Sequence, residues 1–222
     1  MHFAKPLFCW RPRADNTRMA DQSPSRIVRI ALLFEGGLGL VALAIGWAAG
    51  HSPFIGMSDT SQAANHVQAI GWGLVATGPL LVALVLMDQV TWEPIRRLRD
   101  VAGEAILRMF AGASAVQLAA VSLAAGFGEE LLFRGLLQAG VSRLIGGELG
   151  IVLALVLASA LFGVCHWLNT TYALLAMLAG AYFGLLLLAT ENILAPITAH
   201  AAYDFLALAY LLRPGQLFGS EE

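Results

Sequence analysis

Long apolar stretches alternate with short polar segments along most of this chain. An α-helix rises 1.5 Å per residue, so about 20 apolar residues cross the roughly 30 Å of hydrocarbon in a membrane. Six stretches predict membrane-spanning helices: 27–49, 67–87, 110–140, 151–168, 173–188 and 193–212. The third is longer than a straight span, and Gly126 and Gly128 interrupt it. We therefore expect this stretch to bend or to consist of two helices.

The segment 88–108 has a different pattern, in which apolar residues recur at helical spacing between charged ones. Its apolar positions are Ile95, Leu98, Val101, Ala102, Ala105, Ile106 and Met109, and its arginines are Arg96, Arg97, Arg99 and Arg108. Such a basic amphipathic helix is typical of the membrane surface. We expect it to lie on the inner membrane face in a structural role.

The composition agrees with a polytopic membrane protein. Of the 222 residues 58% are hydrophobic and 13% are charged, and the mean hydropathy is +0.72, far from the values of soluble domains. The predicted fold class is an all-α transmembrane bundle of about six spans with one interfacial amphipathic helix. We expect residues 26–213 to form the membrane domain, with a flexible cytosolic tail at 1–25 and a short tail at 214–222.

The distribution of basic residues predicts the orientation. Ten of the 13 lysines and arginines fall between Lys5 and Arg29 or between Arg96 and Arg108, and cytoplasmic loops carry such an excess. We expect a multi-pass protein of the bacterial inner membrane with its N-terminus in the cytoplasm. Arg143 is the exception, because the span count places it outside. Membrane orientation explains the basic clusters, so no nucleic-acid partner is expected.

Two adjacent acids and an arginine stand within the third apolar stretch. On a helix Glu130 and Arg134 are four residues apart and share a face, whereas Glu129 points about 100° away. Charges inside a membrane are costly and mark candidate functional sites. Glu130 and Arg134 are equally consistent with a structural ion pair, but Glu129 has no local partner and is the stronger functional candidate.

Glu35 lies within the first predicted span. It either faces the bundle interior and supports the buried site or extends toward the headgroups. Gly36, Gly37 and Gly39 beside it permit close helix contact, which favours the interior.

Three further polar residues lie on later spans. His166 follows Phe162 by four residues near the end of the fourth span, and His200 and Asp204 are four apart in the sixth. Each would need its own buried partner unless all converge with the glutamates, so convergence is the simpler expectation.

A carboxylate and two histidines in a dry bundle suit hydrolysis. The carboxylate can act as a general base on water, while the imidazoles hold that water, donate to an oxyanion or bind a metal. Glu129, His166 and His200 would be the ligands of a divalent metal such as zinc, although the compact HExxH spacing is lacking. The chain has no GxSxG motif, which disfavours a serine hydrolase.

The order of these motifs resembles a known family. Glu129-Glu130-x-x-x-Arg134, Phe162-x-x-x-His166 and His200-x-x-x-Asp204 are similar to the three motifs of the CPBP family of intramembrane proteases. That group contains the CAAX prenyl endopeptidase of the Rce type and the bacterial Abi or bacteriocin-processing proteins. The resemblance covers roughly residues 95–210.

The resemblance implies roles for these residues. Glu129 would activate the attacking water with help from His166, and His200 and Asp204 would bind the scissile carbonyl and its oxyanion. Glu130, Arg134 and Phe162 would support the site. Members are commonly called metalloproteases, yet a metal-free glutamate mechanism fits the same residues and is the one we favour.

The third motif departs from the family pattern at Asp204. The family often has asparagine there, whose amide donates a hydrogen bond. Asp204 must instead be protonated, orient His200 or bind a cation.

The expected function is therefore an intramembrane endopeptidase, with membrane lipid and a peptide or membrane-anchored protein as partners. Buried Glu, His and Asp residues also build proton relays, so a proton-coupled transporter is the alternative from another class. No inverted repeat of the kind found in transporters is visible. The third hypothesis is a non-catalytic immunity or scaffold protein of the same fold.

Overall fold

The computed structural model describes residues 24–57 and 63–213, and every regular element among them is helical. The predicted tails 1–25 and 214–222 fall mainly or wholly outside the described residues. The helices are α1 (Pro24–Ala48), α2 (Ala63–Gln89), α3 (Glu93–Phe110), α4 (Ala115–Glu130), η3 (Leu131–Gln138), α5 (Ala139–Ile145), α6 (Gly147–Cys165), α7 (Thr170–Thr190) and α8 (Leu194–Leu211).

Six of the described helical segments are long and apolar enough to cross a membrane. They correspond to the six predicted stretches, with ends that differ by a few residues. The all-α prediction is thus confirmed.

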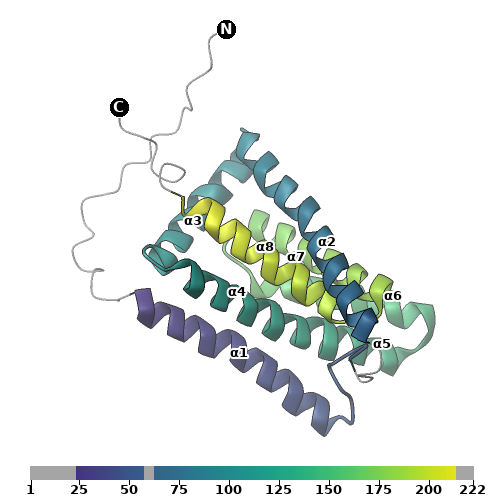
Figure 1. The fold of residues 1–222 in the computed structure, drawn as a ribbon. Coiled ribbons are helices and arrows are strands. Elements are labelled where there is room, and N and C mark those ends of the chain that lie inside the picture. The colour runs from purple at the N-terminus through teal and green to yellow at the C-terminus, as the bar shows by residue number, and fades with distance from the viewer. Residues whose placement is uncertain (1–23, 58–62, 214–222) are drawn as a thin grey trace, which may run out of the picture.

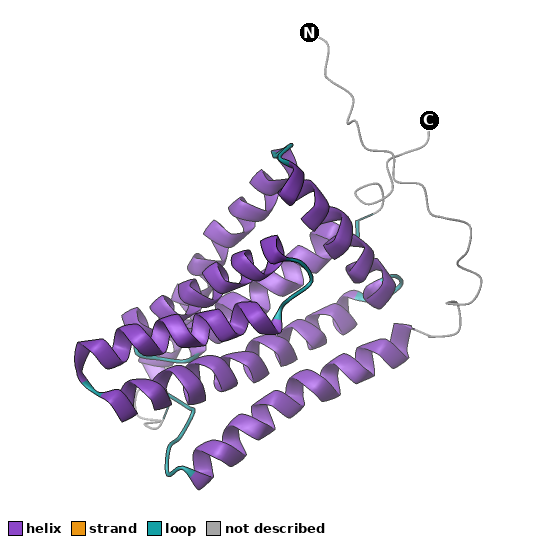
Figure 2. Cartoon of the chain, turned by 180° about the vertical axis from the view of Figure 1, so that it is seen from behind, coloured by secondary structure: helices purple, strands orange, loops and turns teal. Residues whose placement is uncertain are grey.

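The spans form two layers. α1, α4, α8 and α2 lie side by side in this order, and α6 and α7 pack together behind them (Figure 1; Figure 2 shows the opposite side). α4 packs between α1 and α8, and η3 contacts α1 of one layer and α6 and α7 of the other, so the long central span is enclosed by four helices. This arrangement buries the middle of that span, where the acidic pair lies.

The third span runs from Ala115 to Ile145, since Phe110 ends α3 and a turn follows it, and it is one continuous helical segment that changes its winding. α4 begins at a capping box, in which the side chains of Ser114 and Gln117 each bond the other's backbone N–H. Directly after Glu130 the chain adopts the wider π-helix η3, and α5 continues as an α-helix. Short π-helical turns are rare and are frequent at functional sites. The sequence predicts either a bend or two helices in this stretch. The structure instead shows a single helical segment whose winding changes after Glu130.

Glycines allow α4 to approach its neighbours on two sides. A Cβ atom on Gly126 would lie 2.8 Å from the Ala201 methyl carbon of α8, and one on Gly128 would collide with the Glu35 carbonyl oxygen of α1. Gly39 packs against the Gly128 backbone, but Gly36 and Gly37 have no neighbour that a Cβ would meet. The expected close contact of α1 therefore rests on Gly39 alone among its three candidate glycines.

The amphipathic segment is helix α3, and it is confirmed as a helix; its place on the inner membrane face stays a prediction. Ile95 and Leu98 are buried, and Arg99 donates to the carbonyls of Met87 and Asp88 at the end of α2, at 2.8 and 2.7 Å. Both carbonyls lie in the last turn of α2, where regular intrahelical donors run out, and the Val90 N–H also bonds that of Met87. Arg99 therefore caps α2.

Arg143 contacts His51 in the loop that follows α1, which the span count places on the same outer side as Arg143. Its guanidinium donates to Nδ1 of His51 in the loop after α1, and His51 Nε2 donates to the Gly135 carbonyl at 2.8 Å. Arg143 thereby ties α5 to this loop, which gives a structural reason for an arginine outside the two basic segments.

Candidate active site

Glu130 and Arg134 form the centre of a closed cluster with His200. Arg134 Nη1 donates to Glu130 Oε1 at 2.9 Å, and His200 Nδ1 lies 2.8 Å from the same oxygen. The side chains of Glu130 and Arg134 are 0% and 1% exposed. Since a carboxylate only accepts, the His200 Nδ1 proton points at Glu130. We call Glu130, Arg134 and His200 the closed cluster.

Aromatic rings and a helix backbone complete the surroundings of Arg134. Its Nη2 donates to the Gly180 carbonyl of α7 at 2.9 Å. The guanidinium carbon lies 4.5 Å from the Phe162 ring centre and 5.4 Å from that of Phe183, within cation–π range. The arginine thus connects η3, α6 and α7 around one buried charge.

Glu129 points to a different group. Its Oε2 lies 3.5 Å from His166 Nε2 and has no hydrogen-bond partner among the described residues. His166 Nδ1 lies 2.8 Å from the Phe162 carbonyl, which can only accept, so this nitrogen carries a proton. In a neutral imidazole Nε2 is then an acceptor facing the carboxyl group.

Asp204 lies on the other side of His200. Its Oδ2 is 3.5 Å from His200 Nε2, and its side chain is 31% exposed. The His166 side chain is 26% exposed and that of Glu129 10%. We call Glu129, His166 and Asp204 the open cluster, because the buried Glu129 faces partly exposed side chains, whereas the closed cluster is enclosed.

The structure brings every predicted site residue to one place. Phe162 stacks on the His166 ring with centroids 4.3 Å apart and meets the His200 ring edge-on at 5.9 Å. It therefore forms a wall shared by both clusters. The catalytic roles expected of these residues are not decided by their proximity and are taken up below.

Sequence reasoning missed Phe183. Its ring stacks on His200, with centroids 4.9 Å apart and planes 11° from parallel. A single phenylalanine in an apolar helix carries no sequence signal of this position. Its spacing from Gly180, whose carbonyl binds Arg134, could have placed both on one face of α7 but could not have named their partners.

The zinc ligand set expected as one possibility does not assemble. Within the described residues no three His, Cys, Asp or Glu side chains are grouped so that they could hold a metal ion. His200 Nδ1 lies 2.8 Å from Glu130 Oε1 and Nε2 lies 3.5 Å from Asp204 Oδ2, so both ring nitrogens already face carboxyl groups outside the expected ligand set.

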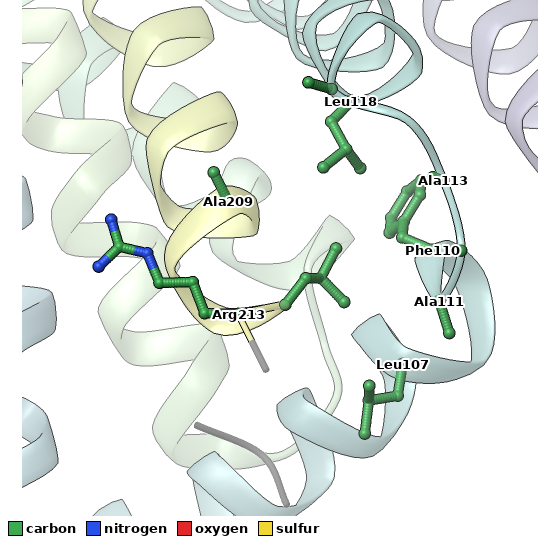
Figure 3. Close-up of a pocket in the computed structure, with 10 residues that line it drawn as sticks. Leu107, Phe110, Ala111, Ala113, Leu118, Ala209 and Arg213 are labelled. Carbon is green, nitrogen blue, oxygen red and sulfur yellow. The ribbon is translucent and has the colours of Figure 1, made fainter. Parts of the chain in front are cut away.

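A cavity elsewhere offers no comparable chemistry. It has a volume of about 540 Å³ and lies between the α3–α4 turn and the end of α8, with Leu107, Phe110, Leu118 and Leu212 among its lining residues (Figure 3). Its lining contains no acid, histidine or cysteine. Chemistry is therefore assigned to the two clusters.

Comparison with known proteins agrees with the motifs. Residues 111–206 match the model of a family described as Rce1-like, type II CAAX prenyl endopeptidase. All three motifs lie in this segment, so the family resemblance is confirmed there. No curated protein and no solved structure matches the chain. The matching family is a protease family, which supports a hydrolase, and with the six apolar helices it identifies an integral membrane protein.

Proposed function

We propose that this chain is an intramembrane endopeptidase that hydrolyses a peptide bond of a membrane-associated or CAAX-type substrate. The observation that carries the proposal is the open cluster. Glu129, which is buried and not used for the structural ion pair, lies 3.5 Å from a partly exposed histidine at the end of another helix.

Glu129 is the proposed general base. A water molecule beside Glu129 and His166 can donate one proton to the carboxylate and a second hydrogen bond to His166 Nε2, whose acceptor state follows from the Nδ1–Phe162 contact. The water oxygen then attacks the scissile carbonyl carbon. Glu129 returns the proton to the leaving amine, so the carboxylate is regenerated.

His200 is the proposed oxyanion donor. Glu130 holds a proton on His200 Nδ1, so Nε2 donates only when the ring is an imidazolium. Asp204, 3.5 Å from Nε2, is the counter-ion that keeps this form. Of the three roles open to Asp204, the geometry favours orientation of His200. The imidazolium would stabilise negative charge on the carbonyl oxygen in the tetrahedral intermediate.

The proposal needs no metal in any step. The ligand geometry above does not fit the zinc ion that the family resemblance suggests, so we derive no chemistry from one. Chelators are expected to leave the activity unchanged.

The orientation follows from charge. With the N-terminus in the cytoplasm of a bacterial inner membrane, α3 and the C-terminal end of α8 face inward, and Arg143 faces outward. The substrate would then reach Glu129 from the lipid or the cytoplasmic side. A prenylated CAAX-type peptide and an unprenylated membrane peptide are the two substrate classes that the family match and the six apolar helices suggest.

The decisive experiment compares wild type with Glu129→Gln in lipid vesicles. Both are offered a fluorogenic prenylated CAAX-type peptide and a library of unprenylated membrane peptides, with and without chelator. Because glutamine cannot accept a proton, cleavage should fall at least ~100-fold, the usual contribution of a general base. The thermal midpoint should stay nearly unchanged, since glutamine has almost the same shape.

Glu148→Gln is the matched control, because Glu148 is an exposed glutamate on α6. It should cleave like wild type. Equal cleavage by wild type and Glu129→Gln would refute the base assignment. If neither cuts any peptide while both stay folded, the protease proposal fails, and proton flux into liposomes becomes the measurement for the transporter alternative.

A further inference from the structure

The loop that follows α1 packs against the π-helix η3. We call its described residues 49–57 the α1 loop, and Figure 1 shows it reaching α5 at one end of the bundle. A Cβ atom on Gly135 would lie 2.4 Å from the Pro53 carbonyl oxygen, so only glycine fits there without a shift. Gly135 directly follows Arg134 of the closed cluster. The loop therefore touches η3 one residue from the buried arginine.

His51 connects the α1 loop to two helical segments at once. Its Nε2 lies 2.8 Å from the Gly135 carbonyl oxygen in η3, and its Nδ1 contacts Nη1 of Arg143 in α5. A carbonyl only accepts and a guanidinium only donates, so Nε2 carries the proton and Nδ1 is the acceptor. Both contacts are therefore satisfied together only by a neutral imidazole in this tautomer.

The imidazole is buried, whereas its cationic partner is not. His51 is 8% exposed, and Arg143 is exposed. A proton on Nδ1 would place an N–H group against the guanidinium and replace a hydrogen bond by a contact between two cations. Arg143 can then move into water, but the buried Nδ1–H would be left without an acceptor, which is costly. The contacts of His51 with η3 and α5 thus depend on its neutral form.

We propose that His51 is a positioning residue for η3 and that acid releases it. With neutral His51 the α1 loop holds the Gly135 carbonyl, and with it the turn that carries Arg134. Imidazoles change charge between about pH 5 and 8. Acid therefore separates the α1 loop from η3, and the stability that both His51 contacts contribute is present at alkaline pH and lost in acid. The consequence for cleavage rests on the proposed function, whereas the release itself does not.

The route from His51 to the site is short. Arg134 donates to Glu130 at 2.9 Å, and Glu130 accepts from His200 Nδ1 at 2.8 Å. When the α1 loop separates, η3 loses the packing of this loop and a donor to one of its carbonyls. Local opening of the turn would disturb the orientation of His200, the proposed oxyanion donor. The release is therefore expected to slow cleavage as pH falls.

His51 packs against three elements, since its N–H also donates to the Gly46 carbonyl of α1 at 2.7 Å. The ionisable side chains of these elements are Arg26, Arg29 and Glu35 on α1, Arg134 on η3 and Arg143 on α5. Glu35, whose Oε2 is buried in the bundle, precedes Gly46 by about 16 Å along the helix. Among the described residues Arg143 is the charged side chain that contacts the His51 ring. The other groups remain in a His51 variant, so a changed pH response reports on His51.

Three variants isolate the two contacts, and a fourth is the control. His51→Gln keeps a donor for Gly135 and an acceptor for Arg143 in one amide but cannot gain a proton. His51→Ala removes both contacts, and Arg143→Met removes the cation. The matched control is His66→Gln, because His66 lies on α2 and contacts Asn192 at 3.1 Å.

Hydrogen exchange followed by mass spectrometry measures the release without any substrate. The proteins are compared in lipid nanodiscs at equal pH between about 5 and 8, so the intrinsic pH dependence of exchange cancels. At the acid end the amides of η3 and the α1 loop should exchange at least about 10-fold faster in wild type than in His51→Gln, the factor expected for one lost hydrogen bond to a charged group. At the alkaline end the two should agree.

The remaining variants have their own expected results. His51→Ala should exchange faster than wild type at the alkaline end, because both contacts are absent. Arg143→Met should respond less to acid, because no guanidinium opposes the imidazolium. His66→Gln should follow wild type at every pH.

Two outcomes overturn the proposal. If wild type and His51→Gln respond alike to acid, His51 is not the group that releases the loop. If His51→Ala exchanges in η3 like wild type at the alkaline end, His51 does not position this segment. Thermal midpoints show which variants are folded, and His51→Gln keeps the test available if His51→Ala does not fold.

Cleavage separates a failure of this proposal from a failure of the proposed function. If a peptide is cut, the kcat of wild type should fall more steeply in acid than that of His51→Gln, with similar values at the alkaline end. Identical pH profiles of kcat overturn the positioning role even where the loop is released. Exchange that depends on His51 supports the release even if no peptide is cut and the protease proposal fails.

Discussion

The closed and open clusters contain the same kinds of side chain at nearly the same depth, yet they differ in how their charges are satisfied. In the closed cluster, Glu130 receives bonds of 2.9 and 2.8 Å from a guanidinium and an imidazole, and its side chain is fully buried. In the open cluster the facing groups are 3.5 Å apart, and His166 is partly exposed while Glu129 is buried. Both bonds go to Oε1 of Glu130, and its Oε2 is buried without a partner among the described residues. The enclosure of this carboxylate, and not complete bonding, leaves little capacity to bind a reacting water.

Adjacent glutamates thus have different tasks. Glu130 orients His200 and pairs with Arg134, which holds η3 against α7 through the Gly180 carbonyl. Glu129 faces the partly exposed His166 at 3.5 Å. Changes in the closed cluster should therefore act mainly on stability, and changes in the open cluster mainly on rate.

The largest stability effect is expected for Arg134→Met. It leaves the buried Glu130 charge without its cation, and such a loss costs about 3–5 kcal/mol. Chemical denaturation in detergent should show this difference, with activity lost in proportion to the unfolded fraction. Replacing Glu130 and Arg134 together by leucine should recover part of the stability, because no unpaired charge remains. A single variant as stable as wild type would contradict the closed cluster's structural role.

Phe162→Leu should affect both clusters to a smaller degree. The ring contacts Arg134 and His166, and its aromatic and cation–π contacts contribute about 1–2 kcal/mol together. The thermal midpoint and kcat should both fall, since His166 loses the ring on which it stacks. The control is Phe110→Leu, a buried phenylalanine at the end of α3, which should lower stability without changing the kcat of folded protein. An unchanged kcat in Phe162→Leu would show that His166 does not need this wall.

Helical spacing was sufficient to predict part of this site. Glu130 and Arg134, and His200 and Asp204, are four residues apart, and both pairs are observed. The separation of Glu129 from the ion pair also follows from the 100° turn per residue. These features are local, so one helix determines them.

Other features depend on neighbouring helices and left no pattern in the sequence. The π-helix begins at Leu131 in a segment whose composition suits an α-helix equally well. Tertiary contacts, such as the bonds from Arg134 to Gly180 and from Gln138 to Gly184, accompany the wider winding. The sequence also left the direction of Glu35 open, because it depends on how closely α1 approaches Gly128.

Asp204→Asn sharpens the assignment within the open cluster. If Asp204 is the counter-ion of a His200 imidazolium, asparagine should lower kcat about 10-fold, which corresponds to roughly 1.4 kcal/mol. The thermal midpoint should change little, because the side chain is 31% exposed. The kcat and the thermal midpoint of wild type and Asp204→Asn are measured in the same vesicles. A faster Asn variant would mean that an amide donor to the oxyanion is preferred and that His200 needs no counter-ion.

The smallest effect is expected where the same spacing occurs at the surface. Glu93 and Arg97 of α3 are four apart like Glu130 and Arg134, with Arg97 Nε 2.7 Å from Glu93 Oε1, but both side chains are exposed. Hydrogen bonds from Arg97, and from Arg96 next to it, hold the pKa of Glu93 below its usual value. A lowered pKa stabilises the fold above the unfolded-state pKa, and that contribution disappears as pH falls through the folded-state pKa.

Arg97→Gln should therefore leave the thermal midpoint at neutral pH unchanged within error, because water and salt screen exposed pairs. Any small difference from wild type should vanish in acid or at high salt. The same measurements on Arg134→Met should show a large difference that high salt does not remove, since the closed cluster is shielded from solvent. If both variants respond alike to salt, burial does not distinguish these two ion pairs. The proposed division between a structural and a reactive cluster would then lose its physical basis.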